Sequence, residues 1–299
     1  MEKEMGDFVS ITVNINIYLI QCFKIRLLGG RLMTGKERII AKFRKDVKGK
    51  KPDTSGANAK HDGKEGHWLE KQFGIVHNAN NSADLYGYEL KNETSSKITF
   101  GDWSANLYIF DDPRISHIFE GKTSLEKRDS FIRMFGKPNE KKGGRHSWSG
   151  EPCPKIAGFN RFGQKLMITA KKDIVAVYDY REDKRDNKND IIPDEIRDGL
   201  IVLARWYGEK SPNPKAKCLK ARVEDKFNDK GWFTCKKDSS GAYKEVCFGE
   251  PMNFDSWLKL VQQGIVFLDS GMYIGNNRKY SQWRSNNSYW DSLIVERYE

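Results

Sequence analysis

The chain has 299 residues, of which 38% are hydrophobic, 31% charged and 12% aromatic. This composition is that of a globular protein with a packed core, and it excludes both a disordered chain and a small disulfide-stapled domain. The net charge of +11 favours a polyanionic partner, with nucleic acid first and an anionic membrane second; a basic surface that is merely solvated is the alternative.

Residues 1–32 are predicted to be an N-terminal extension. Within them, residues 8–23 alternate apolar and polar side chains, which predicts a half-buried strand. The segment is too polar for a membrane span and lacks the cleavage site of a signal peptide. Gly29-Gly30-Arg31 can be encoded by a purine-rich, ribosome-binding run, so we hypothesise that translation starts at Met33. Thr34 would then cap a helix over residues 34–47.

The first half of the remaining chain is predicted to mix helices with strands. A flexible basic loop over residues 44–67 leads into a helix. The expected elements are a helix over 66–73, strands over 84–91 and 98–110, a helix over 124–135, and a Gly- and Pro-rich loop that runs to Pro154.

The second half is predicted to be rich in strands separated by charged loops. The expected strands cover residues 174–180, 199–207, 217–224, 231–235, 245–249 and 265–274, with helices over 254–264 and 289–298. The five cysteines are scattered without a CxxC pair. We therefore expect no disulfide framework or zinc ribbon, and we expect the protein in a reducing bacterial cytoplasm.

Asp84, Glu89 and Lys91 form the group of residues most suited to chemistry. Glu89 and Lys91 project from the same face of a strand, whereas Asp84 has the opposite parity. Asp84 can join them only if the chain bends, and Gly87 is placed to allow a turn or bulge. The strand is expected to anchor in the core through Tyr86, Tyr88 and Leu90.

Phosphodiester hydrolysis needs oxygen ligands for Mg²⁺ and a cation that offsets negative charge. Asp84 and Glu89 are the expected ligands, and Lys91 would orient or deprotonate the attacking water. In isolation this spacing is more often a surface salt bridge. Its context favours chemistry, because a glycine-rich helix start just upstream brings Glu70 toward the cluster.

Three motifs, GKEGHWLEKQFGI, DLYGYELK and TFGDWS, together resemble the MutH-like restriction endonucleases of the MvaI and BcnI type. A weaker similarity continues in FDSWLKLVQQGIVFLDSGMY. The resemblance covers most of the chain from Met33. It implies an α/β fold with a PD-(D/E)xK mixed-sheet core, flanking helices and a DNA-recognition lobe, the two lobes enclosing a DNA cleft.

The resemblance also implies roles for individual residues. Asp84, Glu89 and Lys91 fall on the catalytic trio of the family, and Glu70 matches its helical glutamate. Ala83 replaces the proline that the family name implies, at a position that is often not proline. The expected domains are a catalytic lobe over 33–165 and a DNA-recognition lobe over 166–299, whose last elements return to the core.

The resemblance further implies cleavage at a short CCNGG-like sequence. Guanine edges call for Arg or Lys in the major groove, although each such residue can instead contact phosphate. Aromatic side chains can pack on bases or sugars, and a loop histidine can reach the central base pair, although core packing and inert surface positions are the alternatives. The candidate DNA-binding residues are Lys220, Arg222, Arg278, Lys279, Arg284, Tyr273, Trp283 and His77.

The predicted function is therefore that of a Mg²⁺-dependent type II restriction endonuclease. It would act on double-stranded DNA as a monomer, beside a methyltransferase encoded nearby. The alternatives are a MutH-like mismatch-repair nickase and a DNA-binding protein that does not cut. The central base, the cut position and the methylation sensitivity do not follow from the sequence.

Overall fold

The computed structural model describes residues 32–55, 63–75, 81–93 and 96–299. The chain divides into two compact units, residues 1–41 and residues 42–299. The predicted strand over 8–23 and most of the N-terminal extension lie outside the described residues. Helix α2 (Gly35–Lys42) begins after Thr34, whose hydroxyl accepts from the backbone N–H of Glu37, so the predicted N-cap is confirmed.

The second unit contains a mixed four-stranded sheet in the order β1-β9-β10-β13. Strand β1 (Glu89–Lys91) runs parallel to β9 (Trp232–Lys237), and the other pairs are antiparallel. The sheet continues through β10 (Tyr243–Gly249) and β13 (Ile294–Tyr298). Strands that are far apart in the sequence, β1 and β13, thus belong to one sheet.

Aromatic side chains cover both faces of this sheet. On one face, Trp68 of α3 (Lys64–Gln72) stacks on Tyr243, and Phe73 meets Phe233 edge-on. On the other face, Trp290 of α8 (Asn287–Ser292) packs edge-on against Trp232. Burial of such large rings is a principal source of stability.

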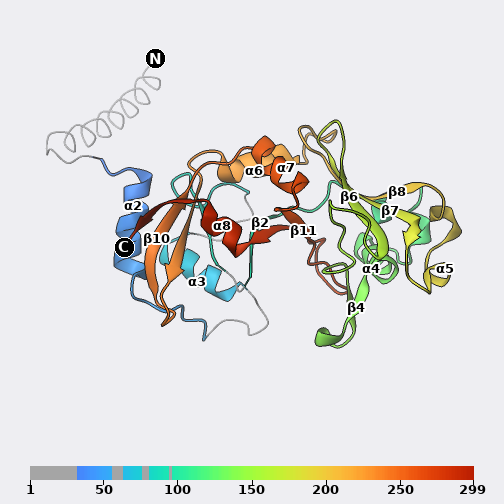
Figure 1. Cartoon of the computed structure of the whole chain (residues 1–299), viewed down its shortest axis with the longest axis horizontal. Coiled ribbons are helices and arrows are strands. Elements are labelled where there is room, and N and C mark those ends of the chain that lie inside the picture. The colour runs from blue at the N-terminus through green and yellow to red at the C-terminus, as the bar shows by residue number, and fades with distance from the viewer. Residues whose placement is uncertain (1–31, 56–62, 76–80, 94–95) are drawn as a thin grey trace, which may run out of the picture. The chain divides into compact units, whose positions relative to one another are not determined.

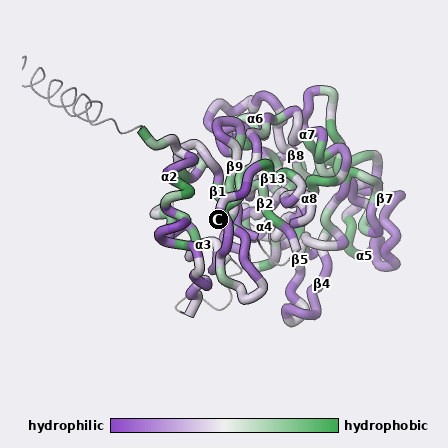
Figure 2. The backbone as a smooth tube through the Cα atoms, turned by 60° about the vertical axis from the view of Figure 1, so that its left-hand side comes forward, coloured by the Kyte–Doolittle hydropathy of each residue, from purple (hydrophilic) through white to green (hydrophobic). Residues whose placement is uncertain are grey.

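Two further sheets are antiparallel. One has the order β11-β12-β2, with β11 (Phe267–Asp269), β12 (Gln282–Asn286) and β2 (Lys97–Asp102). The other has the order β3-β8-β7-β6. Its strands are β3 (Leu107–Tyr108), β8 (Leu200–Trp206), β7 (Ile174–Asp183) and β6 (Phe162–Ile168). The hairpin of β4 (Lys137–Asn139) and β5 (Arg145–Ser147) is a hydrophilic stretch (Figure 2).

Helices pack around these sheets. Helix α4 (Ser124–Phe135) has the predicted bounds and begins with a capping box between Thr123 and Glu126. Helices α6 (Leu219–Phe227) and α7 (Phe254–Gln262) pack against each other (Figure 1). The short helical turns are η1 (Phe43–Val47), η2 (Ile109–Asp111), η3 (Ser116–Ile118), η4 (Glu140–Lys142), α5 (Lys188–Ile191) and η5 (Asp194–Ile196). In the described part of the chain no helix combines the length and the apolar character of a membrane span.

Several predicted elements are wrong. Residues 217–224 were expected to be a strand, but α6 occupies most of them, since Leu219, Val223 and Phe227 recur every four residues and are buried together. The predicted closing helix over 289–298 is divided, because residues 294–298 pair with β10 as strand β13. Of the strand expected over 84–91, only the last three residues form a strand, β1.

Candidate active site

A tight turn brings Asp84 to the beginning of β1. Leu85 and Tyr88 pair across the turn, and both residues at its tip have positive φ, +52° at Tyr86 and +85° at Gly87. Two positive φ angles characterise a type I′ turn, which reverses the chain within two residues. The predicted turn at Gly87 is thus confirmed. Tyr86, expected in the core, instead lies 46% exposed at the tip.

The turn directs the Asp84 carboxylate back to the strand. Its Oδ2 accepts a hydrogen bond from the backbone N–H of Leu90 at 2.9 Å. Among the described strands β1 pairs with β9 alone, so the N–H of Leu90 is available for this bond. A continuous strand would direct Asp84 to the face opposite Glu89. The turn instead brings the Asp84 carboxylate back to β1, as the sequence analysis expected.

Glu89 and Lys91 share a face of β1, as predicted. Lys91 Nζ lies 2.9 Å from Glu89 Oε1, and the two residues are 7% and 3% exposed. Lys91 Nζ also donates to the backbone carbonyls of Thr99 and Phe100 on β2, at 2.9 and 3.1 Å. The pair is buried, so it is not the surface salt bridge that the isolated spacing allows.

Lys226 is a fourth charged residue of this cluster, which the sequence analysis missed. Its Nζ lies 2.6 Å from Glu89 Oε1, the oxygen that Lys91 also contacts. Lys226 projects from the last turn of α6. The four-residue spacing of Leu219, Val223 and Phe227 was the signal that would have placed it on a helix.

Burial and charge give the two carboxylates different pKa values. Burial, and then the charge of Glu89, raise the pKa of Asp84 to about 6. Burial also disfavours the charged form of Glu89, but Lys91 and Lys226 outweigh it and hold the pKa of Glu89 below its usual value. Burial lowers the pKa of Lys91. Near pH 6 Asp84 therefore exchanges its proton while Glu89 stays charged.

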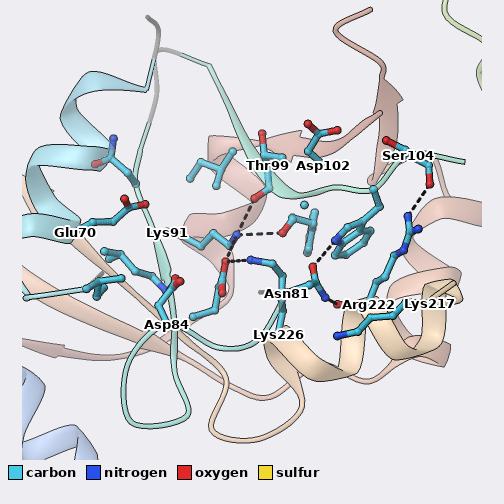
Figure 3. Close-up of a pocket in the computed structure, with 18 of the residues that line it drawn as sticks. Glu70, Asn81, Asp84, Lys91, Thr99, Asp102, Ser104, Lys217, Arg222 and Lys226 are labelled. Atoms are coloured by element: carbon cyan, nitrogen blue, oxygen red, sulfur yellow. Dashed lines mark hydrogen bonds and ion pairs between the residues drawn. The ribbon is translucent and has the colours of Figure 1, made fainter. Parts of the chain in front are cut away.

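These side chains line one pocket of about 720 Å³. Figure 3 shows Asp84, Lys91 and Lys226 around it, with Glu70 of α3 on the same side as Asp84. The pocket continues along β2 past Asp102 to Ser104 and along α6 to Arg222. The structure thus brings together all four residues predicted for catalysis: Glu70, Asp84, Glu89 and Lys91.

The carboxylates of this pocket fit a hard divalent cation. Glu89 Oε2 is buried and makes no hydrogen bond to any described residue. A buried carboxylate oxygen without a partner is costly unless a ligand satisfies it. Mg²⁺ takes one or two carboxylates and completes its shell with water and phosphate oxygens. Among the described residues, no three or more acidic, histidine or cysteine side chains are grouped so that they could hold a metal ion.

The two candidate DNA-binding residues on α6 are on different faces. They were expected on one face of a strand, but in a helix residues 220 and 222 point in nearly opposite directions. Arg222 lines the pocket, where its Nη1 donates to the carbonyl of Ser104 at 2.6 Å (Figure 3). Lys220 is exposed outside the pocket lining.

Arg278, Lys279 and Arg284 pair with carboxylates. Arg278 contacts Asp102 at the pocket and keeps 57% of its side chain exposed. Lys279 contacts Asp111, and Arg284 lies 3.1 Å from Asp269. Of the three, Arg278 is the most accessible to DNA.

The remaining candidates differ in exposure. Trp283 is 0% exposed and packs edge-on between Trp206 and Trp257, so it belongs to the core and its predicted contact with DNA is wrong. Tyr273 is partly exposed, with the Arg145 guanidinium 3.3 Å from its ring centre. His77 lies outside the described residues.

Comparisons with known proteins identify the family of this chain. Residues 47–298 match the model of a family described as LlaMI restriction endonuclease. The type II restriction enzyme ScrFI of Lactococcus lactis subsp. cremoris is 57% identical over 264 residues, which are 87% of this chain and 97% of that enzyme.

A solved structure gives the fold. The complex of the restriction endonuclease MvaI with its cognate DNA substrate superposes with a TM-score of 0.51, covering 87% of this chain and 96% of that chain at 13% identity. The mixed sheets and helices described above thus have the fold of that endonuclease, as the expected α/β fold requires. The chain belongs to the LlaMI restriction endonuclease family and is a type II restriction endonuclease.

Proposed function

We propose that this enzyme uses Mg²⁺ to cut both strands of double-stranded DNA at a CCNGG-like sequence. The observation that carries the proposal is the convergence of Asp84, Glu89 and Lys91 in one pocket, with Glu89 Oε2 buried and without a hydrogen bond to any described residue. The relatives named above are a type II restriction enzyme and an endonuclease bound to its cognate DNA.

Asp84 and Glu89 would hold the metal ion. A bound Mg²⁺ would supply the Lewis acidity that phosphodiester hydrolysis needs. Glu89 would offer Oε2, since its Oε1 is already occupied by Lys91 and Lys226. Asp84 binds a cation only when ionised, so its pKa of about 6 makes metal binding stronger above that pH.

Lys91 would orient the attacking water and offset charge at the phosphate. Its ammonium is held beside the carboxylates by Glu89 and by two carbonyls of β2, and it would bind the water by giving up one of these hydrogen bonds. Glu70, on the Asp84 side of the pocket (Figure 3), would assist through water or the metal shell.

The pocket is proposed to continue into a DNA-binding surface through Arg222 and Arg278. Lys220, Lys279, Arg284 and Tyr273 would add phosphate or base contacts from its margins. A net charge of +11 favours such a surface through counterion release. We further propose that the enzyme acts as a monomer in the bacterial cytoplasm, beside a methyltransferase that protects the host DNA.

Cleavage of defined DNA tests this function. Plasmid DNA is incubated with the protein in Mg²⁺ or in EDTA, and the ends of the fragments are sequenced. We expect discrete, Mg²⁺-dependent fragments whose ends share a CCNGG-like sequence. Duplexes that vary the central pair and each outer pair then define the site, with Lys91→Met as the inactive control.

Three results would contradict the proposal. Cutting at unrelated sequences would contradict the CCNGG-like recognition site. Cutting that persists in EDTA would contradict the role of the metal ion. Nicking of one strand that requires a hemimethylated site would favour the MutH-like nickase instead.

A further inference from the structure

Lys226 has hydrogen-bonding capacity in the active site that Lys91 lacks. An ammonium group has three donor hydrogens. Lys91 Nζ directs its three to Glu89 Oε1, Thr99 O and Phe100 O. Lys91 is therefore saturated and cannot contact DNA without giving up one of these bonds.

Lys226, by contrast, holds one hydrogen bond with the described residues, the 2.6 Å bond to Glu89 Oε1. Its side chain is 17% exposed and lines the pocket. Two of its donor hydrogens are thus available on the pocket side. A lysine with free donors beside the metal-binding carboxylate is a natural partner for a phosphate oxygen.

The pocket separates its charges. Asp84 and Glu70 lie on one side, and Lys226 with Arg222 lies on the α6 side (Figure 3). Arg222 and Lys226 are four residues apart, so they share a helix face. Lys217, in the loop before α6, also lines the pocket, where it pairs with Asp225. If a DNA strand lay between the two sides, one of its phosphates would face both the proposed metal ligands and the cationic residues of α6.

We propose that Lys226 is a second active-site lysine that binds the scissile phosphate, with Arg222 contacting the neighbouring phosphate of the same strand. In the free enzyme Glu89 holds Lys226 in place. When DNA enters, the free donors of Lys226 bind a phosphate oxygen, while Oε2 of Glu89 would stay available to hold a metal ion. This inference rests on the proposed nuclease function.

DNA binding measured in EDTA tests the phosphate contact separately from metal-dependent chemistry. The binding of a CCNGG duplex to Lys226→Met, Lys226→Arg and wild type is compared by fluorescence anisotropy across salt concentrations. We expect Lys226→Met to bind about 5- to 10-fold more weakly, with a salt slope smaller by about 0.9, the value of one phosphate contact. Lys226→Arg should restore both. Lys259→Met, which removes an exposed lysine of α7 outside the pocket, is the charge-matched control.

A double-mutant cycle tests whether Glu89 holds Lys226. Glu89→Gln should tighten DNA binding in EDTA, because it releases Lys226. That gain should shrink in the Glu89→Gln/Lys226→Met double variant. If Glu89→Gln improves DNA affinity equally in the wild-type and in the Lys226→Met background, the improvement comes from the loss of general charge repulsion. That result would overturn the proposed coupling between Glu89 and Lys226.

The outcomes separate this inference from the function on which it rests. A wild-type protein that binds no DNA in EDTA and cuts none in Mg²⁺ would refute both. Wild-type cleavage at CCNGG together with an unchanged salt slope in Lys226→Met would refute the phosphate contact alone, and would leave Lys226 as a residue that only positions Glu89. Thermal melting of each variant checks folding, and Lys226→Gln replaces Lys226→Met if the latter does not fold.

Discussion

The carboxylate of Asp84 accepts a hydrogen bond from the backbone N–H of Leu90, six residues later in the chain. This bond closes the turn at Tyr86 and Gly87 onto the first strand. It places the Asp84 carboxylate on the side of β1 that carries Glu89, the other proposed metal ligand, although a continuous strand would direct the two to opposite faces. The geometry of the catalytic cluster therefore depends on the turn as much as on the strand.

Replacing Gly87 by Ala should disrupt this turn. Gly87 has φ +85°, and a Cβ there would lie 2.2 Å from Asp229 Oδ2 and 2.7 Å from Lys230 Cγ. We expect Gly87→Ala to lower the free energy of unfolding by about 2 kcal/mol or more and to reduce cleavage. The control is Gly143→Ala, at φ +67° with no atom within 4 Å, which should cost about 1 kcal/mol. Urea unfolding measures both variants, and equal costs would contradict the steric argument.

Ionisation of Asp84 should destabilise the metal-free protein. Its pKa is raised from 3.8 to about 6 in the fold, so the folded protein binds the proton more tightly than the unfolded chain does. Wild type should therefore lose stability between about pH 4 and pH 6 relative to Asp84→Asn. Above pH 6 the difference should be constant, at about 3 kcal/mol.

Urea unfolding in EDTA between pH 4 and pH 8 measures this difference. A gap between the two proteins that does not change with pH would show that the Asp84 carboxyl titrates normally. Added Ca²⁺ should reverse the order above pH 6, because only the charged wild-type side chain contributes fully to cation binding.

Replacing Lys91 by Met should abolish cleavage and preserve DNA binding. The ammonium is saturated by Glu89 and β2 in the free enzyme, and we assign it to the hydrolytic step. The single-turnover cleavage rate should fall about 100-fold or more, while affinity for the duplex in EDTA changes by less than about 3-fold. Lys244→Met, at an exposed position of β10, should cut normally. Retained cleavage in Lys91→Met would remove this residue from the catalytic set.

Replacing Arg128 by Met should loosen the segment that carries Arg278. Arg128 is 1% exposed on α4, and its guanidinium donates to the backbone carbonyls of Asn276 and Arg278 at 2.8 and 3.1 Å. We expect Arg128→Met to lower the free energy of unfolding by about 3 kcal/mol. Arg133→Met, at an exposed position of the same helix, should change it by less than about 0.5 kcal/mol. Similar values for the two variants would contradict a structural role for the buried guanidinium.

The sequence by itself determined the local parts of this enzyme. The helix over Ser124–Phe135 was predicted with its observed bounds, and the structure adds a capping box between Thr123 and Glu126. The shared face of Glu89 and Lys91 follows from strand geometry, and the turn follows from the glycine at position 87. The quoted motifs also indicated the family that the comparisons confirm.

Only the tertiary structure decided the parts that depend on distant segments. Residues 294–298 are a strand because the edge of β10 pairs with them, and Trp283 is buried because two other tryptophans enclose it. Lys226 reaches Glu89, 137 positions earlier in the chain, from a helix whose first residues had been predicted to be a strand. Local propensity does not encode which strand edge is open or which charges meet, since those interactions form only when segments far apart in the sequence pack together.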